Sequence, residues 1–216
     1  AELHGAFDDA LVDGRLDLGW YWPQYDPAEY PATNLLLDST VERDPRMYTG
    51  FYSSMAAWQE IGLTTPEVVA EFTDKGITPL TIMSTDGPAI IACSQPIESA
   101  ADLQGRQTRA GGTVHARQLE ELGAIPVSLP YPEVYEALQR GILDCSMSAH
   151  TVATTGGHLE VAPYVYHTDG EALASTPTNF YAGPSFLSLP KAAQQLIQES
   201  ATVMSAYAFD RFFERV

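Results

Sequence analysis

A nine-residue pattern that occurs twice is the feature that most restricts the fold of this chain. Residues 10–18 read ALVDGRLDL and residues 137–145 read ALQRGILDC, so both follow Ala-Leu-x-x-Gly-x-Leu-Asp. A glycine just past a helix supplies the left-handed residue that ends it, and the apolar residues that follow begin a strand. Such junctions are common in α/β proteins, but the matched Ala, Leu and Asp positions indicate two related lobes.

Helical and strand-like patterns alternate along the rest of the chain. Helices are expected over 44–62, 67–75, 113–122 and 132–140, and strands over 77–83, 89–93, 106–109, 125–129, 142–147, 164–166 and 179–186. A final amphipathic helix is expected from Pro190, with the apolar positions Leu196, Val203, Tyr207 and Phe212 facing inward. Strict alternation predicts largely parallel sheets with helices on both faces.

Composition excludes several classes of protein. The net charge is −17, so nucleic acids and anionic membrane surfaces would be repelled. No run of eighteen apolar residues occurs, and the sequence therefore predicts no membrane insertion. The two cysteines, Cys93 and Cys145, each lie in an apolar strand-like run. That position favours buried free thiols over a disulfide.

Motifs of enzymes and metal sites are scarce. The chain has no G-x-S-x-G, G-x-x-x-x-G-K-[ST], G-x-G-x-x-G or H-E-x-x-H sequence. The histidines His150, His158 and His167 match no compact metal-ligand spacing, so their placement is interpreted as chance. The sequence predicts no catalytic residue, no metal and no cofactor.

Arg109 is the strongest candidate for a binding residue. It ends a predicted strand, and Gly111, Gly112 and Thr113 follow at the start of a predicted helix. A guanidinium can bind a carboxylate through two parallel hydrogen bonds, and the amides at a helix N-terminus favour anions. A solvated surface arginine fits this pattern equally well when the pattern is taken alone.

Residues 94–148 closely resemble the DctP-type solute-binding proteins of TRAP (tripartite ATP-independent periplasmic) transporters. The matching residues are Pro96-Ile97, Ala101-Asp102-Leu103-x-Gly105, Thr108-Arg109, Leu122-Gly123-Ala124-x-Pro126-Val127 and Glu133-Val134-Tyr135-Glu136-Ala137-Leu138-Gln139-x-Gly141-x-Leu143-Asp144. A looser similarity covers residues 14–38, 160–165 and 189–190, so the resemblance extends over nearly the whole chain.

The resemblance implies an α/β fold of the periplasmic-binding-protein type II kind, with a ligand cleft between two lobes. Lobe I would comprise residues 1–86 and about 175–213, and lobe II residues 87–174. The chain would cross between them near 86–89 and 172–178. The family's N-terminal strand–helix–strand and C-terminal helices have no counterpart in these 216 residues.

The resemblance also assigns roles in lobe II. Arg109 would form the salt bridge with the ligand carboxylate, and Tyr131 would pack against the body of the ligand. Ser148 occupies a position where many members carry Asn, and His150 just beyond could substitute for it. Ala89 stands where sialic-acid-binding members carry a second Arg, which argues for a smaller or more apolar acid.

In lobe I, the repeat makes Trp20-Tyr21-Trp22 equivalent to residues 147–149. Ligands in such folds bind at the carboxyl ends of strands, so we expect these aromatic residues to face the cleft, with at least one packing between helices. Asn179 is expected on the hinge side.

Together these features predict a periplasmic or otherwise extracytoplasmic, secreted protein that is not an enzyme, whose signal sequence has been removed. It would capture a small organic acid and deliver it to the membrane permease subunits of a TRAP transporter. Two alternatives remain open. One is the ligand-sensing domain of a receptor with the same fold, and the other is an α/β enzyme that uses Arg109 to hold a carboxylate substrate.

Overall fold

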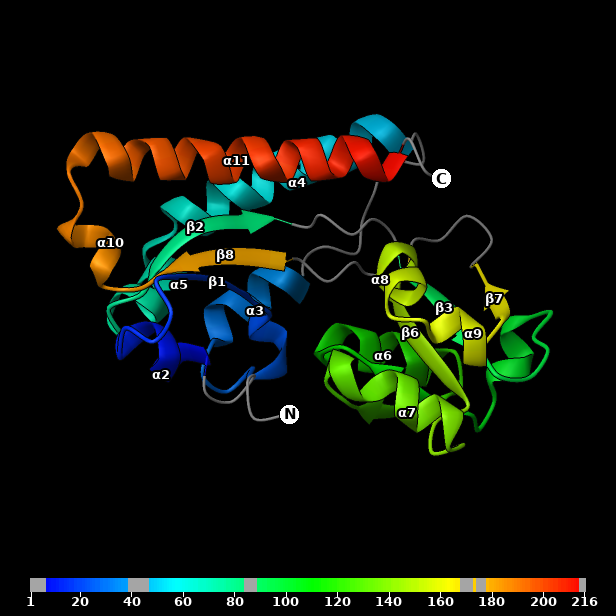
Figure 1. Ribbon diagram of the computed structural model, residues 1–216. Helices are drawn as coiled ribbons and strands as arrows, with labels where there is room; N and C mark the ends of the chain where they lie inside the picture. The colour runs from blue at the N-terminus through cyan, green and yellow to red at the C-terminus, as the bar shows by residue number, and fades with distance from the viewer. Residues whose placement is uncertain (1–6, 39–46, 84–88, 168–172, 174–177, 214–216) are drawn as a thin grey trace. The chain divides into compact units, whose positions relative to one another are not determined.

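The computed structural model describes residues 7–38, 47–83, 89–167, 173 and 178–213, which form two compact units (Figure 1). Lobe I comprises Glu2–Leu36, Arg46–Thr85 and Pro177–Val216, and lobe II is built mainly from Asp86–Thr176. The predicted crossings near 86–89 and 172–178 lie largely outside the described residues, and they stay a prediction.

Lobe I is a three-stranded antiparallel sheet covered by helices on both faces. Its elements are α2 (Phe7–Val12), β1 (Leu18–Tyr21), the 3-10 helix η1 (Pro23–Tyr25), α3 (Pro31–Asp38), α4 (Met47–Thr64), α5 (Pro66–Thr73), β2 (Thr78–Met83), β8 (Thr178–Ala182), α10 (Ser185–Ser188) and α11 (Lys191–Phe213). The strand order is β1-β8-β2, with β8 antiparallel to both neighbours. One core cluster holds Phe7, Leu11, Tyr21, Tyr30, Phe72, Ile77 and Tyr181, and a second holds Leu80, Ala182, Phe186 and Ala201.

Helix α11 packs on lobe I through a different face from the predicted one. Leu196, Val203 and Tyr207 are 64%, 67% and 58% exposed, whereas Ala201 and Ser205 are buried. Small side chains let the helix backbone approach the sheet closely, and the larger apolar residues therefore point outward. Phe212, also predicted on the inner face, lies among the residues whose side chains are not described. The preceding strand is also shorter than predicted, because α10 begins within the predicted range 179–186.

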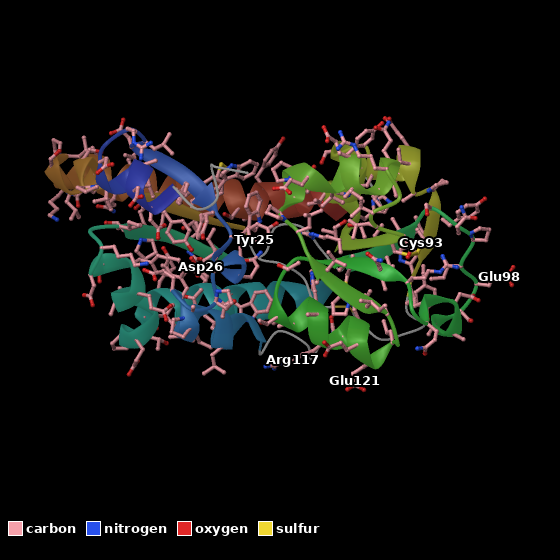
Figure 2. All side chains as sticks on the ribbon, turned by 90° about the horizontal axis from the view of Figure 1, so that it is seen from below. Tyr25, Asp26, Cys93, Glu98, Arg117 and Glu121 are labelled. Carbon is pink, nitrogen blue, oxygen red and sulfur yellow. A yellow bond between two sulfur atoms is a disulfide. The ribbon has the colours of Figure 1, made fainter. Side chains whose placement is uncertain are left out.

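Lobe II is a five-stranded sheet between two helical layers. Its elements are β3 (Ala89–Cys93), η3 (Ala100–Leu103), β4 (Gln107–Ala110), α6 (Thr113–Glu121), β5 (Ile125–Ser128), η4 (Tyr131–Glu133), α7 (Val134–Gln139), β6 (Cys145–Ala149), α8 (His150–Thr155), α9 (His158–Val161) and β7 (Tyr164–Tyr166). The strand order is β5-β4-β6-β3-β7. Leu119 of α6 belongs to one core cluster, and residues of α7 and α9 belong to another. Arg117 and Glu121 of α6 are exposed and point away from the sheet (Figure 2).

The prediction of largely parallel sheets is wrong, because four of the six described strand pairs are antiparallel. β5, β4 and β6 are parallel, but β3 runs antiparallel to β6 and β7, and every described pair in lobe I is antiparallel. The reason lies in the chain path. β3 follows β2 of lobe I, and β8 follows β7 of lobe II. Each of these two strands therefore enters its sheet from the other lobe. It is not joined to a neighbouring strand by the helical crossover connection that makes the strands of a βαβ unit parallel.

The repeated helix–glycine–strand junction is confirmed. Gly14 and Gly141 both adopt left-handed backbones, with φ of 73° and 70°. The backbone bonds repeat as well, because Leu16 N–H donates to the Ala10 carbonyl and Leu143 N–H donates to the Ala137 carbonyl. The two strands that follow, β1 and β6, each pair antiparallel with the strand that enters from the other lobe.

The prediction of free thiols is wrong, because Cys93 and Cys145 form a disulfide (Figure 2). The register of β3 and β6 places the two residues directly opposite each other, with their Cα atoms 4.0 Å apart. Both side chains are fully buried in the core cluster beneath α6. Sequence patterns do not reveal which strands are neighbours, so this pairing could not be derived from the apolar context of each cysteine.

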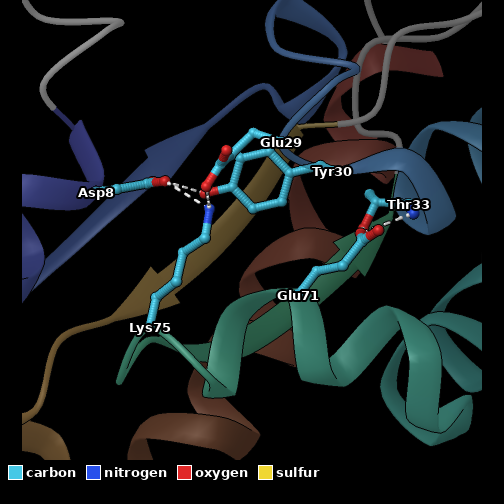
Figure 3. A network of polar contacts seen from close by, with 6 residues as sticks. All are labelled: Asp8, Glu29, Tyr30, Thr33, Glu71 and Lys75. Atoms are coloured by element: carbon cyan, nitrogen blue, oxygen red, sulfur yellow. Dashed lines mark hydrogen bonds and ion pairs between the residues drawn. The ribbon is translucent and has the colours of Figure 1, made fainter.

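A polar network attaches the segment after β1 to α5 (Figure 3). Glu71 accepts hydrogen bonds from the Ala32 and Thr33 amides and from the Thr33 hydroxyl, and it therefore caps the N-terminus of α3. Lys75 pairs with Asp8 and Glu29 and lies 4.1 Å from the centre of the Tyr30 ring. The Tyr30 hydroxyl donates to Asp8, and burial together with this carboxylate raises the tyrosine pKa. These contacts fix the chain between β1 and the start of α3.

Candidate ligand-binding site

Most of the residues predicted to bind ligand meet at one edge of the lobe II sheet. β4, β5 and β6 are parallel neighbours, so their carboxyl ends lie together, and the antiparallel β3 begins there. Open α/β sheets bind ligands at this edge. The predicted residues located there are Arg109, Gly112 and Thr113 at β4 and α6, Tyr131 after β5, Ser148 and His150 at the end of β6, and Ala89 at the start of β3.

Arg109 is buried and its guanidinium is held in one orientation. Its side chain is 4% exposed. Nε donates to the Leu129 carbonyl at 3.0 Å and Nη1 donates to the Met147 carbonyl at 3.0 Å. A Cβ atom at Gly111 would lie 2.9 Å from Nη1, so glycine at that position allows the guanidinium to lie against the chain at the start of α6. The arginine is thus attached to β6 and to the residue that follows β5.

The start of α6 follows β4, the strand that carries Arg109. Gly112 is the N-cap residue, and Thr113 is the first, half-buried residue of the helix. The Gly111 amide donates to Nδ1 of the buried His115 at 3.2 Å. One amide at this end of the helix is therefore used within the protein.

Ser148 lies on the same face of the sheet as Arg109. Arg109 is in register with Val127 of β5 and Ser146 of β6, and alternate residues of a strand share a face. Ser146 and Ser148 therefore face the same helical layer as Arg109, formed by α7 and α9. Ser148 is 2% exposed.

Tyr131 contacts a histidine that the sequence analysis did not select. The ring centres of Tyr131 and His158 are 5.4 Å apart, and the Tyr131 hydroxyl donates to the Val152 carbonyl at 3.3 Å. A Cβ atom at Gly156 would lie 2.4 Å from the Tyr131 oxygen and 2.9 Å from Nε2 of His158. Glycine at this position therefore makes room for both side chains.

His158 is held neutral beside Arg109. It is 1% exposed, and burial together with the positive charge of Arg109 lowers its pKa to about 4. His158 contacts Tyr131 because η4 packs against α9. No local sequence motif marks this contact, so the spacing of the histidines alone did not indicate it.

The other two lobe II candidates are part of the strand pair β3–β6. Ala89 is 6% exposed and pairs with Ala149, and it also forms a bridge to Leu173. His150 is the half-buried first residue of α8. Ala89, which stands where sialic-acid-binding members carry a second Arg, is thus buried between neighbouring strands.

In lobe I, two of the three predicted aromatic residues, Trp20 and Tyr21, point to opposite faces of β1. Trp20 is 58% exposed and lies 5.5 Å from Trp22, ring centre to ring centre. Tyr21 points the opposite way and is buried in the core, stacked on Phe7 at 5.0 Å. Asn179 is buried in β8 directly opposite Tyr21.

Within the described residues, no cluster of three or more His, Cys, Asp or Glu side chains is placed to bind a metal ion. The helices in the described part of the chain include none with the length and apolar character needed to cross a membrane.

Comparisons with known proteins agree with the resemblance found in the sequence. The family model for DctP, "Bacterial extracellular solute-binding protein, family 7", matches residues 53–215. The ectoine-binding periplasmic protein TeaA of Halomonas elongata is 30% identical over 138 residues, which is 62% of this chain and 38% of TeaA. The chain therefore spans well under half the length of that relative.

Solved structures share the fold. A TRAP solute binding protein from a marine metagenome, specific for aromatic acid ligands and in complex with 3-hydroxybenzoate, has a TM-score of 0.80 at 24% identity. It matches over 97% of this chain and 64% of its own. A TRAP periplasmic solute binding protein from Sulfitobacter sp. NAS-14.1 with bound β-D-galacturonate has a TM-score of 0.74 at 20% identity, over 98% of this chain and 68% of its own. The predicted two-lobed α/β fold is confirmed, and the chain belongs to family 7 of the bacterial extracellular solute-binding proteins, the DctP family.

Proposed function

We propose that this protein binds a small organic acid outside the cytoplasm and delivers it to the permease subunits of a TRAP transporter, without catalysing a reaction. The observation that carries this proposal is the burial and fixed orientation of Arg109 at the carboxyl ends of the lobe II strands. Of the Lys and Arg side chains whose burial the structure describes, Arg109 alone is buried.

A buried guanidinium favours an anionic ligand. Removing a charge from water costs several kcal/mol unless an opposite charge and hydrogen bonds compensate. A carboxylate matches the planar guanidinium through two parallel hydrogen bonds. The two carbonyl bonds of Arg109 hold the guanidinium in place before the ligand arrives, which reduces the entropy lost on binding.

Neighbouring side chains suit the rest of an acid ligand. Tyr131 offers an aromatic surface, and Ser148 and His150 offer polar groups. Ala89 supplies no second cation, which favours an acid with a single carboxylate near Arg109. Similar proteins bind ectoine, 3-hydroxybenzoate and galacturonate, each of which carries a carboxyl group.

The disulfide supports the proposed compartment. Disulfides persist in oxidising environments such as the bacterial periplasm and are rare in the cytosol. The pairing of Cys93 with Cys145 inside the lobe II core is therefore consistent with an extracytoplasmic protein.

A thermal-shift screen tests the proposal directly. The wild type and Arg109→Ala would be heated with mono- and dicarboxylates of three to eight carbons, including keto, hydroxy and aromatic acids. A specific ligand stabilises the folded protein by RT ln(1 + [L]/Kd). Loss of the buried pair should cost about 3–5 kcal/mol of binding free energy, so the shift should vanish in Arg109→Ala.

Arg117→Ala is the matched control, because Arg117 is exposed on α6. It removes the same charge from the chain and should leave the shift unchanged. Absence of any shift with a folded wild-type protein would contradict acid binding. A shift retained in Arg109→Ala would exclude Arg109 as the carboxylate ligand.

A further inference from the structure

Four buried hydrogen-bonding atoms in lobe II have no partner among the described residues. They are Ser146 Oγ, Ser148 Oγ, Thr151 Oγ1 and His158 Nδ1. More than nine in ten buried polar groups in proteins are hydrogen-bonded, so each exception requires an explanation. All four atoms come from one short stretch of chain, the β6–α8–α9 segment, so we look for one explanation for all of them.

The two serines lie on the strand that bonds to Arg109, and Thr151 follows that strand in the chain. Ser146 is in register with Arg109, and Ser148 is the next residue on the same face of β6. The carbonyl that accepts from Arg109 Nη1 belongs to Met147, between the two serines. Thr151 lies in the first turn of α8, which begins directly after β6.

His158 closes the group from α9. Its ring lies tilted against that of Tyr131, with centres 5.4 Å apart, and burial together with the charge of Arg109 lowers its pKa. The two serines and His158 are each at most 2% exposed. Hydroxyl and neutral imidazole groups therefore gather where the sequence and the resemblance place a ligand carboxylate.

The chemistry of these groups specifies what they can bind. A hydroxyl both donates and accepts a hydrogen bond, and a neutral imidazole nitrogen does one or the other. None of them carries a charge that could compensate a second carboxylate. An uncharged ligand oxygen would instead satisfy them, because ligand hydroxyls also donate and accept.

We propose that Ser146, Ser148, Thr151 and His158 form a hydroxyl-binding subsite next to Arg109, so that the ligand is a hydroxylated monocarboxylic acid. This inference rests on the proposed function, since it assumes that Arg109 holds the carboxylate. The subsite selects hydroxylated acids, because an acid without the hydroxyl leaves the buried groups unpaired.

The test compares acids that differ by one hydroxyl. Calorimetry would measure Kd for propanoate and 2-hydroxypropanoate, butanoate and 3-hydroxybutanoate, phenylacetate and mandelate, and benzoate and 3-hydroxybenzoate. In the wild type, the hydroxylated member of at least one pair should bind tenfold or more tightly, the ratio expected for roughly one buried hydrogen bond.

Single substitutions identify which residues produce the preference for hydroxylated acids. Ser148→Ala, Thr151→Val and His158→Phe should each bring that ratio towards one by weakening the hydroxylated acid alone. Thr154→Val is the matched control, since Thr154 lies on α8, is exposed and donates to the carbonyl of His150 in its own helix. It should leave the ratio unchanged, and the near-isosteric Thr151→Val keeps the test valid if another variant fails to fold.

The outcomes separate the two proposals. If plain acids bind as tightly as their hydroxylated partners, and both depend on Arg109, the subsite is refuted while acid binding stands. A ratio that persists in all three subsite variants also refutes it. If no acid binds the folded wild type, both proposals fall.

Discussion

Reduction of the disulfide should destabilise the protein strongly, and the structure sets the size of the effect. Cys93 and Cys145 are separated by 52 residues in sequence. Closing a loop of that length lowers the entropy of the unfolded chain, and the chain-entropy relation gives about 4 kcal/mol at 25 °C. For a chain of about 200 residues, each kcal/mol corresponds to about 2–4 °C in Tm. The reduced protein should therefore melt about 8–16 °C below the oxidised protein.

Differential scanning calorimetry with and without a reductant measures this difference. Comparing the oxidised and reduced wild type isolates the cross-link, because both sulfur atoms remain in the core. The double variant Cys93→Ala, Cys145→Ala should melt low in either condition and should not respond to reductant. Alkylation of the denatured, unreduced protein gives an independent check, since no thiol should react.

Two results would refute the reasoning. Alkylation of both cysteines without reduction would show that the bond is absent. A drop in Tm below about 3 °C in fully reduced protein would show that the loop between the cysteines is already restricted in the unfolded chain.

Two further predictions concern other parts of the structure. Glu71→Ala should lower the free energy of unfolding by about 1–2 kcal/mol in urea titrations, because the amide groups at the start of α3 and the Thr33 hydroxyl lose their acceptor; Glu67→Ala, exposed on the same helix, should cost less. His158 should destabilise the protein in acid. Its pKa is about 4 in the folded protein and 6.5 in the unfolded chain. The unfolded state therefore binds more protons between these two values, and the free energy of unfolding falls as the pH drops from about 6.5 to 4. His158→Phe should flatten this part of the stability profile by up to about 3 kcal/mol, and an unchanged slope would show that burial beside Arg109 does not hold the histidine neutral.

Local patterns in the sequence predicted the elements well because they depend on neighbouring residues. The positions of Gly14 and Gly141 marked two helix ends, and the glycines after Arg109 marked the start of α6. The burial of Arg109 could be expected only through the family resemblance, since a solvated arginine has the same local pattern.

The features that sequence analysis missed depend on which distant segments become neighbours. The disulfide depends on the register of β3 against β6, and the contact of Tyr131 with His158 depends on the packing of η4 and α9. The inward face of α11 was misassigned because hydrophobic periodicity ranks Leu196 above Ala201, whereas close packing on the sheet favours the small residue.

The order of strands in lobe I has a consequence for how the protein is made. β1 and β2 do not touch each other, because β8 lies between them and bonds to both. A ribosome releases β8 only after β3–β7, so the described strands β1 and β2 become joined only after the five described strands of lobe II have been made. Domains generally fold as units, so we expect lobe II to complete its sheet before β8 joins β1 to β2 in lobe I.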